Sequence, residues 1–271
     1  MKTLWIGCSH SSGIFNSNDQ RLYLPKPKNN IPVAGLPSKI AYEYKDWYNW
    51  KIISAPGQGI IEFSSIISYL HYENLLNFDN LIIQNTNEPR IVTFDYRSEN
   101  QKFKYLKEYI EQDNSERLWP YYRYDSDYTH QEDFKMTFNI HPFALFSRYQ
   151  SYFKDVDTKT TFLDIVEEIG LSVKHSTFGY LQMAYDNILE ITRKRNINFY
   201  TFCWENIQTS YGNYYSEDYK QYDIFNGHGL CEIIPNFKEN CHIESKHPNK
   251  KAIELAIPVI IDALKQRGFE V

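Results

Sequence analysis

The chain begins its first apolar run with Thr3-Leu4-Trp5-Ile6-Gly7-Cys8-Ser9-His10-Ser11. A short apolar stretch that runs into Gly-x-Ser is typical of a buried strand that ends in a tight turn. We therefore predict a strand over 3–7, with Ser9 just beyond its carboxyl end. The position of this serine matters because an acid–histidine pair lies near the other end of the chain, just before the last predicted helix.

Strand-like and helix-like segments alternate at both ends of the sequence, which is typical of a parallel sheet with helices on both faces. Further strands are predicted at 51–55, 80–84 and 198–204, and helices at 38–49, 60–76, 161–169, 179–195 and 249–266. Helical spacing is clearest for Ile60, Phe63, Ile67 and Leu70. We predict a three-layer α/β/α fold with a flavodoxin-like, mostly parallel sheet, in a single domain that spans residues 1–271.

The regular alternation lapses between about residues 91 and 160. A structureless loop of this length is uncommon in a compact domain. We therefore predict a large insertion after the third strand, either a lid or a subdomain, with a helix around 101–112. The stretch Tyr121-Tyr122-Arg123-Tyr124 lies inside it. Its rings are either a platform on which a sugar stacks or the apolar packing of the insertion, and we favour the second interpretation.

Charge and composition exclude some classes of partner. The formal net charge is −5 and the pI is about 5.9, whereas a nucleic-acid-binding surface is normally basic. No apolar run approaches the ~20 residues that cross a bilayer, and no opening stretch has the pattern of a signal peptide. The four cysteines are irregularly spaced, as in a reduced intracellular protein. We therefore expect no nucleic-acid or membrane partner and a cytoplasmic location, with association with a virus left open.

Polar residues follow the first three predicted strands and precede the last helix. In open α/β sheets, ligands bind at the carboxyl ends of the strands, so these residues are expected to converge. Acyl transfer needs a hydroxyl nucleophile, a base within hydrogen-bond reach, and donors for the developing oxyanion. Ser9 and His247 supply the first two, with Glu244 three residues before the histidine. The donors are the backbone amides of Ser9 and Gly57 and the side-chain amide of Asn87.

The four motifs, in this order, resemble those of the SGNH/GDSL family of esterases, acylhydrolases and deacetylases. Gly7-Cys8-Ser9-His10-Ser11 matches the nucleophile turn, with Cys8 in place of Asp. Gly57 matches the glycine that follows the second strand. Asn85-Thr86-Asn87-Glu88 matches the Gly-x-Asn-Asp loop, with Asn85 for Gly and Glu88 for Asp. Glu244-Ser245-Lys246-His247 matches the terminal Asp-x-x-His, with Glu for Asp.

The resemblance implies a serine ester hydrolase, such as an esterase or deacetylase, that needs no cofactor and no metal. His247 would take the hydroxyl proton of Ser9, and Glu244 would orient the imidazole. Ser9, Gly57 and Asn87 would form the oxyanion hole. The implied substrate is a small-molecule or carbohydrate ester, and the habits of the family favour O-acylated carbohydrate. His10 and Arg90 lie beside the motifs and are candidates for contacts with the substrate.

Alternatives stay open at several positions. Cys8 is a second candidate nucleophile, although adjacent side chains usually point apart and we expect this thiol to be buried. Gly59 is the rival of Gly57, and Asn85 is the rival of Asn87. A metal site is not expected, because the spacing of the remaining candidates matches no zinc pattern. These candidates are Cys231, Cys241 and His242.

Two other functions are compatible with the same fold. An O-acyltransferase would use the same residues, so only its products would distinguish it from a hydrolase. A non-catalytic binding or structural protein, such as a component of a viral particle, would keep the fold without the activity. Departures from the family motifs favour this last reading, and they lie at Cys8, Asn85, Glu88 and Glu244. The sequence predicts neither the oligomeric state nor the host.

Overall fold

The computed structural model describes residues 1–8, 11, 35–44, 47–54, 59–85, 106–111, 121–122, 181–204, 217–241 and 248–270. These residues form a five-stranded sheet in the order β4-β2-β1-β3-β5, with every neighbouring pair parallel. The strands are β1 (Thr3–Gly7), β2 (Trp50–Ser54), β3 (Asn80–Asn85), β4 (Tyr121–Tyr122) and β5 (Asn198–Cys203). The four longer strands follow the doubly wound, flavodoxin-like order. The predicted α/β fold is confirmed.

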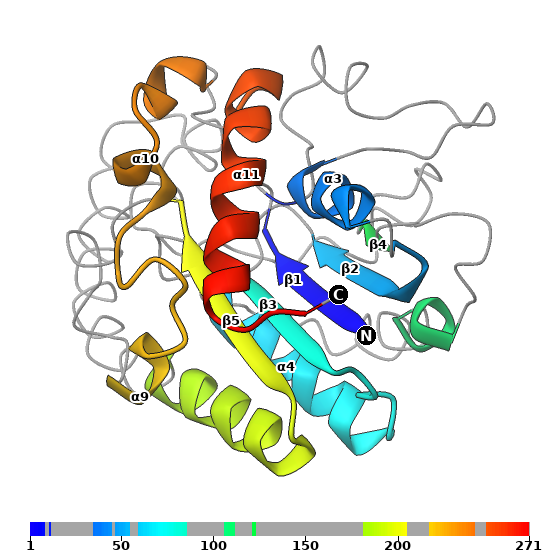
Figure 1. Cartoon of the computed structure of the whole chain (residues 1–271). Coiled ribbons are helices and arrows are strands. Elements are labelled where there is room, and N and C mark those ends of the chain that lie inside the picture. Colours follow the sequence, from blue (N-terminus) through cyan, green and yellow to red (C-terminus); the bar gives the residue numbers. More distant parts are fainter. Residues whose placement is uncertain are drawn as a thin grey trace, which may run out of the picture.

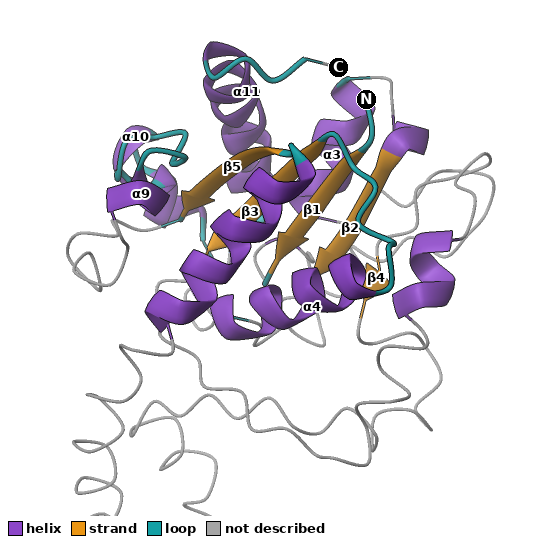
Figure 2. Ribbon diagram, turned by 90° about the horizontal axis from the view of Figure 1, so that it is seen from below, coloured by secondary structure: helices purple, strands orange, loops and turns teal. Residues whose placement is uncertain are grey.

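Helices cover both faces of this sheet (Figures 1 and 2). The structure has helices α3 (Gly35–Glu43), α4 (Ile60–Tyr72), α9 (Glu217–Lys220), α10 (Leu230–Ile233) and α11 (Lys250–Gln266), and 3-10 turns η1 (Trp47–Asn49) and η4 (Phe237–Asn240). Residues 106–111 and 181–195 are also helical. Figure 2 shows α4 and helix 181–195 on the near face of the sheet, with α11 behind it. The layers are therefore α/β/α.

The side chains of β1 point alternately to the two faces of the sheet, so the hydrophobic core has two parts, one on each face. Leu4 and Ile6 pack with α4 and helix 181–195 on one face of the sheet, whereas Trp5 packs under α3 and α11 on the other. All three side chains are fully buried. Successive side chains of a strand point to opposite faces, so a strand with no polar position is expected to lie between two helical layers. Trp5 meets Phe202 of β5 edge-on at 5.5 Å between ring centroids.

The apolar face predicted for α4 is confirmed, because the four residues at helical spacing are buried, namely Ile60, Phe63, Ile67 and Leu70. The helix predicted at 179–195 is present over 181–195, and it buries a similar face that consists of Leu181, Ala184, Ile188 and Ile191. Helix α4 ends four residues earlier than predicted, because Asn74 adopts a left-handed conformation (φ 57°). Its amide donates to His71 O and the next amide, of Leu75, to Leu70 O, which is a Schellman C-cap.

The helix predicted at 38–49 is wrong in its limits. Helix α3 begins at Gly35 and ends at Glu43, and the separate turn η1 follows it. Trp50 is the first residue of β2, where it pairs with Thr3 of β1 and stacks on Trp5. The burial of this ring between the sheet and Phe269 favours the strand.

The outer edge of β2 is covered in two ways. Tyr121 and Tyr122 form the short strand β4, which pairs with Ile53 and Ser54. One residue earlier, the Tyr109 hydroxyl donates to Ile52 O and accepts from Ile52 N, at 3.0 and 2.9 Å. A covered edge cannot pair with another chain. Residues 106–111 confirm part of the helix predicted at 101–112, whereas most of the predicted insertion and the helix at 161–169 lie outside the described residues.

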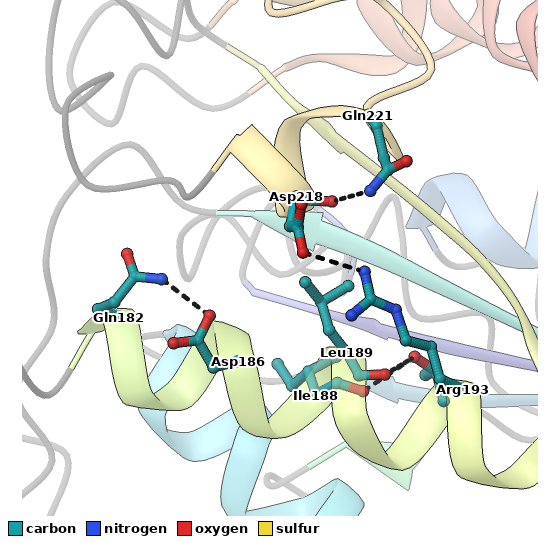
Figure 3. Close-up of polar contacts among 8 residues, drawn as sticks. Gln182, Asp186, Ile188, Leu189, Arg193, Asp218 and Gln221 are labelled. Atoms are coloured by element: carbon teal, nitrogen blue, oxygen red, sulfur yellow. Dashed lines mark hydrogen bonds and ion pairs between the residues drawn. The ribbon is translucent and has the colours of Figure 1, made fainter.

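Surface contacts join helix 181–195 to α9 (Figure 3). Arg193 donates to Asp218 at 3.3 Å, and Asp218 O accepts from the side chain of Gln221 at 2.7 Å. Because Arg193 and Asp218 are exposed, solvent screens this ion pair and it contributes little to stability. The apolar face described above therefore positions the helix. No helix within the described ranges combines the length and the apolar character that a bilayer crossing requires.

Candidate functional site

All residues that the sequence assigned to the site lie outside the described residues. They are Ser9, His10, Gly57, Asn87, Arg90, Glu244 and His247. Their roles therefore stay predictions. The structure does describe the strands, turns and helix that adjoin them, and these fix where each segment leaves the scaffold.

Strands β1, β2 and β3 end together at one edge of the sheet. Gly7 pairs with Ser54, so β1 and β2 end in register. Ile6 pairs with Ile83, and β3 continues to Asn85 at the same edge. Neighbouring strands lie about 4.8 Å apart. The segments that contain Ser9, Gly57 and Asn87 therefore leave the sheet side by side from three adjacent strands.

The segment that contains Glu244 and His247 is anchored at both of its ends. Cys241 forms an antiparallel bridge with Pro248, and the Asn249 amide donates to Asn240 O at 3.0 Å. Asn249 also caps α11, because its side chain accepts from Ala252 N at 3.0 Å, which is a preferred role of Asn. The residues on either side of 242–247 are therefore held together at the start of α11. The cap at Asn249 confirms the predicted start of this helix.

Packing ties the start of α11 to the carboxyl edge of the sheet. Trp204 follows β5 directly and packs on Phe237 of η4, 5.3 Å between ring centroids, and η4 leads into Cys241. At the other end of α11, Phe269 packs on Trp50 at the start of β2. Figure 1 shows α11 running against the direction of the strands, and both general views place the two termini together. The end of β1 and the start of α11 therefore lie on the same side of the molecule.

A buried polar network holds the turn that follows β1. The Ser11 amide donates to Cys8 O at 3.0 Å. The Ser11 hydroxyl accepts from Trp5 Nε1 at 3.0 Å and donates to Gln84 Oε1 at 3.1 Å. Gly7 is required beneath it, because a Cβ there would lie 2.2 Å from Ser11 Oγ. The sequence pattern Gly-x-Ser-x-Ser thus has a structural basis in its first and last residues.

Cys8 is buried, as predicted. Its exposed fraction is 1%, and its thiol donates to Gln84 Oε1 at 3.2 Å. A thiol directed into the core is poorly placed to attack a substrate. This observation favours Ser9 over Cys8 as the nucleophile.

Asn85, the alternative to Asn87 as a donor of the oxyanion hole, is buried in the core. Its exposed fraction is 1%; its side-chain amide donates to the Thr201 hydroxyl and its oxygen accepts from the Tyr219 hydroxyl. Burial raises the pKa of the Tyr219 phenol, which keeps this donor protonated. Asn85 therefore joins β3 to β5, and its amide does not face a substrate.

Gly59, the rival of Gly57, also has a structural role. It is the N-cap residue of α4, with an extended backbone, and its carbonyl accepts from Phe63 N at 3.0 Å. This favours Gly57, two residues closer to β2, as the glycine of the oxyanion hole.

The sequence analysis did not single out Asp223, a buried acid beside the middle of β5. Burial raises the pKa of this carboxyl to about 6, and hydrogen bonds from the backbone of Phe225 and Gly227 only partly offset it. Its backbone carbonyl accepts from Arg267 at 2.8 Å. Residue 223 forms a β-bridge with Thr201 in the middle of β5, so it lies away from the carboxyl edge of the sheet. Its carboxyl stabilises the turn that follows it, through the hydrogen bonds from Phe225 and Gly227.

No group of three or more metal-ligating side chains gathers within the part of the chain that the structure describes. Cys231 and Cys241 are half-buried thiols, and His242 lies outside the described residues.

Comparisons of the chain with protein-family models, with curated proteins and with solved structures found no match. The functional interpretation therefore depends on the chain's own residues and geometry.

Proposed function

We propose that the chain is a serine ester hydrolase with Ser9 as nucleophile and His247 as general base. One observation carries the proposal. The end of β1, two residues before Ser9, and the start of α11, which follows His247, lie at the same edge of the sheet. The neighbouring strands β2 and β3 also end at this edge, so the segments with Gly57 and Asn87 begin there too.

The proposed reaction has two steps. Neutral His247 accepts the Ser9 proton as the serine oxygen attacks the ester carbonyl, and it then donates this proton to the leaving alcohol. Water, activated by the same imidazole, cleaves the acyl-enzyme to release the acid. Glu244 orients the imidazole. The amides of Ser9 and Gly57 and the side chain of Asn87 bind the oxyanion, and loss of one such donor typically costs about 3–4 kcal/mol in the barrier.

For the substrate we propose an O-acylated carbohydrate, and we now prefer the sugar platform to apolar packing for the tyrosine-rich stretch, because of its place in the fold. The stretch starts with β4, which pairs with the last two residues of β2. It therefore begins at the carboxyl edge, beside the segment that contains Gly57. Aromatic rings near a site offer apolar faces to sugar rings, and His10 and Arg90 are proposed to contact the polar groups of the substrate.

We also propose a reducing compartment, the cytoplasm, as the place of action. Each of the four cysteines is a thiol rather than half of a disulfide. Two of them, Cys8 and Cys203, are buried at 1% exposure.

Labelling with a fluorophosphonate probe tests the proposal. We expect one phosphonate per chain, located on Ser9 by peptide mass spectrometry, and no labelling in Ser9→Ala. Hydrolysis of a short-chain aryl acetate should rise with pH through the titration of His247, near ~6.5. A folded protein that neither labels nor hydrolyses would support the non-catalytic alternative, and transfer of the acyl group to an added sugar would identify an acyltransferase.

A further inference from the structure

We propose that Gln84 is a positioning residue that sets the reactivity of Ser9 by fixing the turn after β1. This inference rests on the proposed function. It concerns a residue outside the four motifs, on the strand next to β1 rather than on β1 itself.

Gln84 is an unusual residue for its place. It follows Leu81-Ile82-Ile83 in β3, and its exposed fraction is 0%. Burying a side-chain amide is unfavourable unless its hydrogen bonds are made. Here both ends are bonded, because Oε1 faces three donors of the β1 turn and Nε2 donates to Asn85 O at 2.5 Å.

The three donors lie on both sides of Ser9. The Cys8 amide and thiol approach Gln84 Oε1 at 3.3 and 3.2 Å, and the Ser11 hydroxyl approaches it at 3.1 Å. Cys8 immediately precedes Ser9, and Ser11 follows two residues later. A single buried oxygen therefore holds the two ends of the segment that carries the proposed nucleophile.

Two further residues lock the same turn from β1. Trp5 Nε1 donates to the Ser11 hydroxyl, which in turn donates to Gln84 Oε1. Gly7 leaves room for Ser11 directly above the strand. Trp5 packs on the α3 and α11 face of the sheet, so Ser11 and Gln84 meet on the face that is covered by α11, the helix that follows His247 in the chain.

Without Gln84, buried donors at Cys8 and Ser11 would lose their shared acceptor, and the turn would relax to satisfy them. A displacement of about 1 Å between reacting groups can lower a rate about 100-fold. We therefore expect Gln84→Met, similar in size but with no acceptor oxygen, to lower kcat and the phosphonate labelling rate of Ser9 about 10- to 100-fold. KM should change little, since Gln84 lies beneath the turn rather than against the substrate. Gln84→Glu should recover most of the loss, because burial favours the neutral carboxyl, which retains an acceptor oxygen for the turn and an O–H donor for Asn85 O.

Thr192→Val is the matched control. Thr192 is 2% exposed, and its hydroxyl bonds only to Ile188 O and Leu189 O of its own helix. The substitution removes the buried hydrogen bonding of this hydroxyl in helix 181–195. It should therefore lower the unfolding temperature without changing the labelling rate of Ser9. Labelling of Gln84→Met at the wild-type rate, in folded protein, would overturn the inference.

A second measurement reports on the turn itself. The alkylation rate of Cys8, followed by peptide mass spectrometry, and the hydrogen exchange of the Trp5 indole should both rise at least tenfold in Gln84→Met and stay unchanged in Thr192→Val. Unchanged values would show that Gln84 does not hold the turn. If the wild-type protein does not label, the proposed function fails, and these readouts still decide whether the turn is held. Should Gln84→Met not fold, Ser11→Ala must show the same effects in smaller measure, or the inference is wrong.

Discussion

Two buried polar clusters of the fold hold turns, but they differ in charge and in place. The cluster around Gln84 lies at the carboxyl ends of β1 and β3 and consists of an amide, a hydroxyl, a thiol and an indole, all neutral. The cluster around Asp223 lies beside the middle of β5 and contains a carboxyl and the guanidinium of Arg267. One is next to the proposed site, and the other is remote from it.

The difference separates two kinds of pH dependence. The amide of Gln84, the hydroxyl of Ser11 and the indole of Trp5 do not titrate near pH 7, so their support of the turn after β1 is independent of pH in this range. A buried carboxyl with a pKa of about 6 changes its charge just below neutrality. We therefore predict that the pH profile of the proposed activity reports on the proposed base, His247, whereas the pH profile of stability reports on Asp223.

The largest effect is expected from Gly7→Ala. A Cβ at this position would lie 2.2 Å from Ser11 Oγ and 2.7 Å from its Cβ, so Ser11 must leave its place between Trp5 and Gln84. We expect a loss of about 3 kcal/mol in the free energy of unfolding, the upper part of the range for overpacking, together with loss of Ser9 labelling. Chemical denaturation and the labelling assay measure the two effects.

Gly268→Ala is the control for this substitution. Gly268 has φ +81° and open space around its Cβ position, so the cost is backbone strain alone, about 1–2 kcal/mol. Labelling should persist. If both variants labelled at the wild-type rate, the packing of Ser11 on Gly7 would be irrelevant to the proposed site.

Asp223→Asn should change the pH dependence of stability. The pKa of the carboxyl is raised by burial to about 6 in the folded chain, against about 3.9 unfolded. Folding therefore takes up a proton between these values, so this group contributes stability at low pH that is lost as the pH rises to 7, about 3 kcal/mol in all. The nearby charges, Arg267 and His228, oppose the shift.

Unfolding free energies measured at pH 4 and pH 7 check this expectation. Wild type should lose about 2 kcal/mol more than Asp223→Asn between the two values, since part of the total effect falls below pH 4. An equal dependence in both proteins would show that the carboxyl is hydrated in the folded state.

The smallest effect is expected from Tyr219→Phe. It removes the donor to Asn85 Oδ1 at 3.3 Å and leaves that buried oxygen without its partner. A loss of about 1–2 kcal/mol in the free energy of unfolding is expected, against none for Tyr72→Phe, whose residue is 82% exposed. A wild-type melting temperature in Tyr219→Phe would mean that Asn85 is not held as described, and it would return Asn85 to the candidates for the oxyanion hole.

Local patterns predicted the scaffold well. β1 was predicted to the residue, β3 to within one residue, and the start of α11 to within one, because apolar runs and an Asn cap mark these elements in the sequence. The limits of the helix predicted at 38–49 were wrong, and the two-residue strand β4 was not predicted. In both cases the partner that decides the structure, β1 for Trp50 and β2 for Tyr121, is distant in the chain.

The residues that hold the turn after β1 were harder to predict than the motifs of the proposed site. Gln84 and Ser11 are 73 residues apart, and no spacing rule connects a strand residue with a turn in a neighbouring strand. A signal was present, since Gln84 is a polar residue at the end of a buried apolar strand, but its partner was not. The burial of Cys8 was predicted correctly from the neighbouring serine, whereas the roles of Ser9, Gly57, Asn87, Glu244 and His247 stay predictions.

The most direct measurement is a crystal structure of the protein after reaction with a fluorophosphonate. The proposal predicts phosphorus bonded to Ser9 Oγ, a phosphoryl oxygen directed at the amides of Ser9 and Gly57 and at Asn87, and the His247 imidazole within about 3 Å of the serine oxygen. An unmodified Ser9, or a His247 on another side of the sheet, would contradict it.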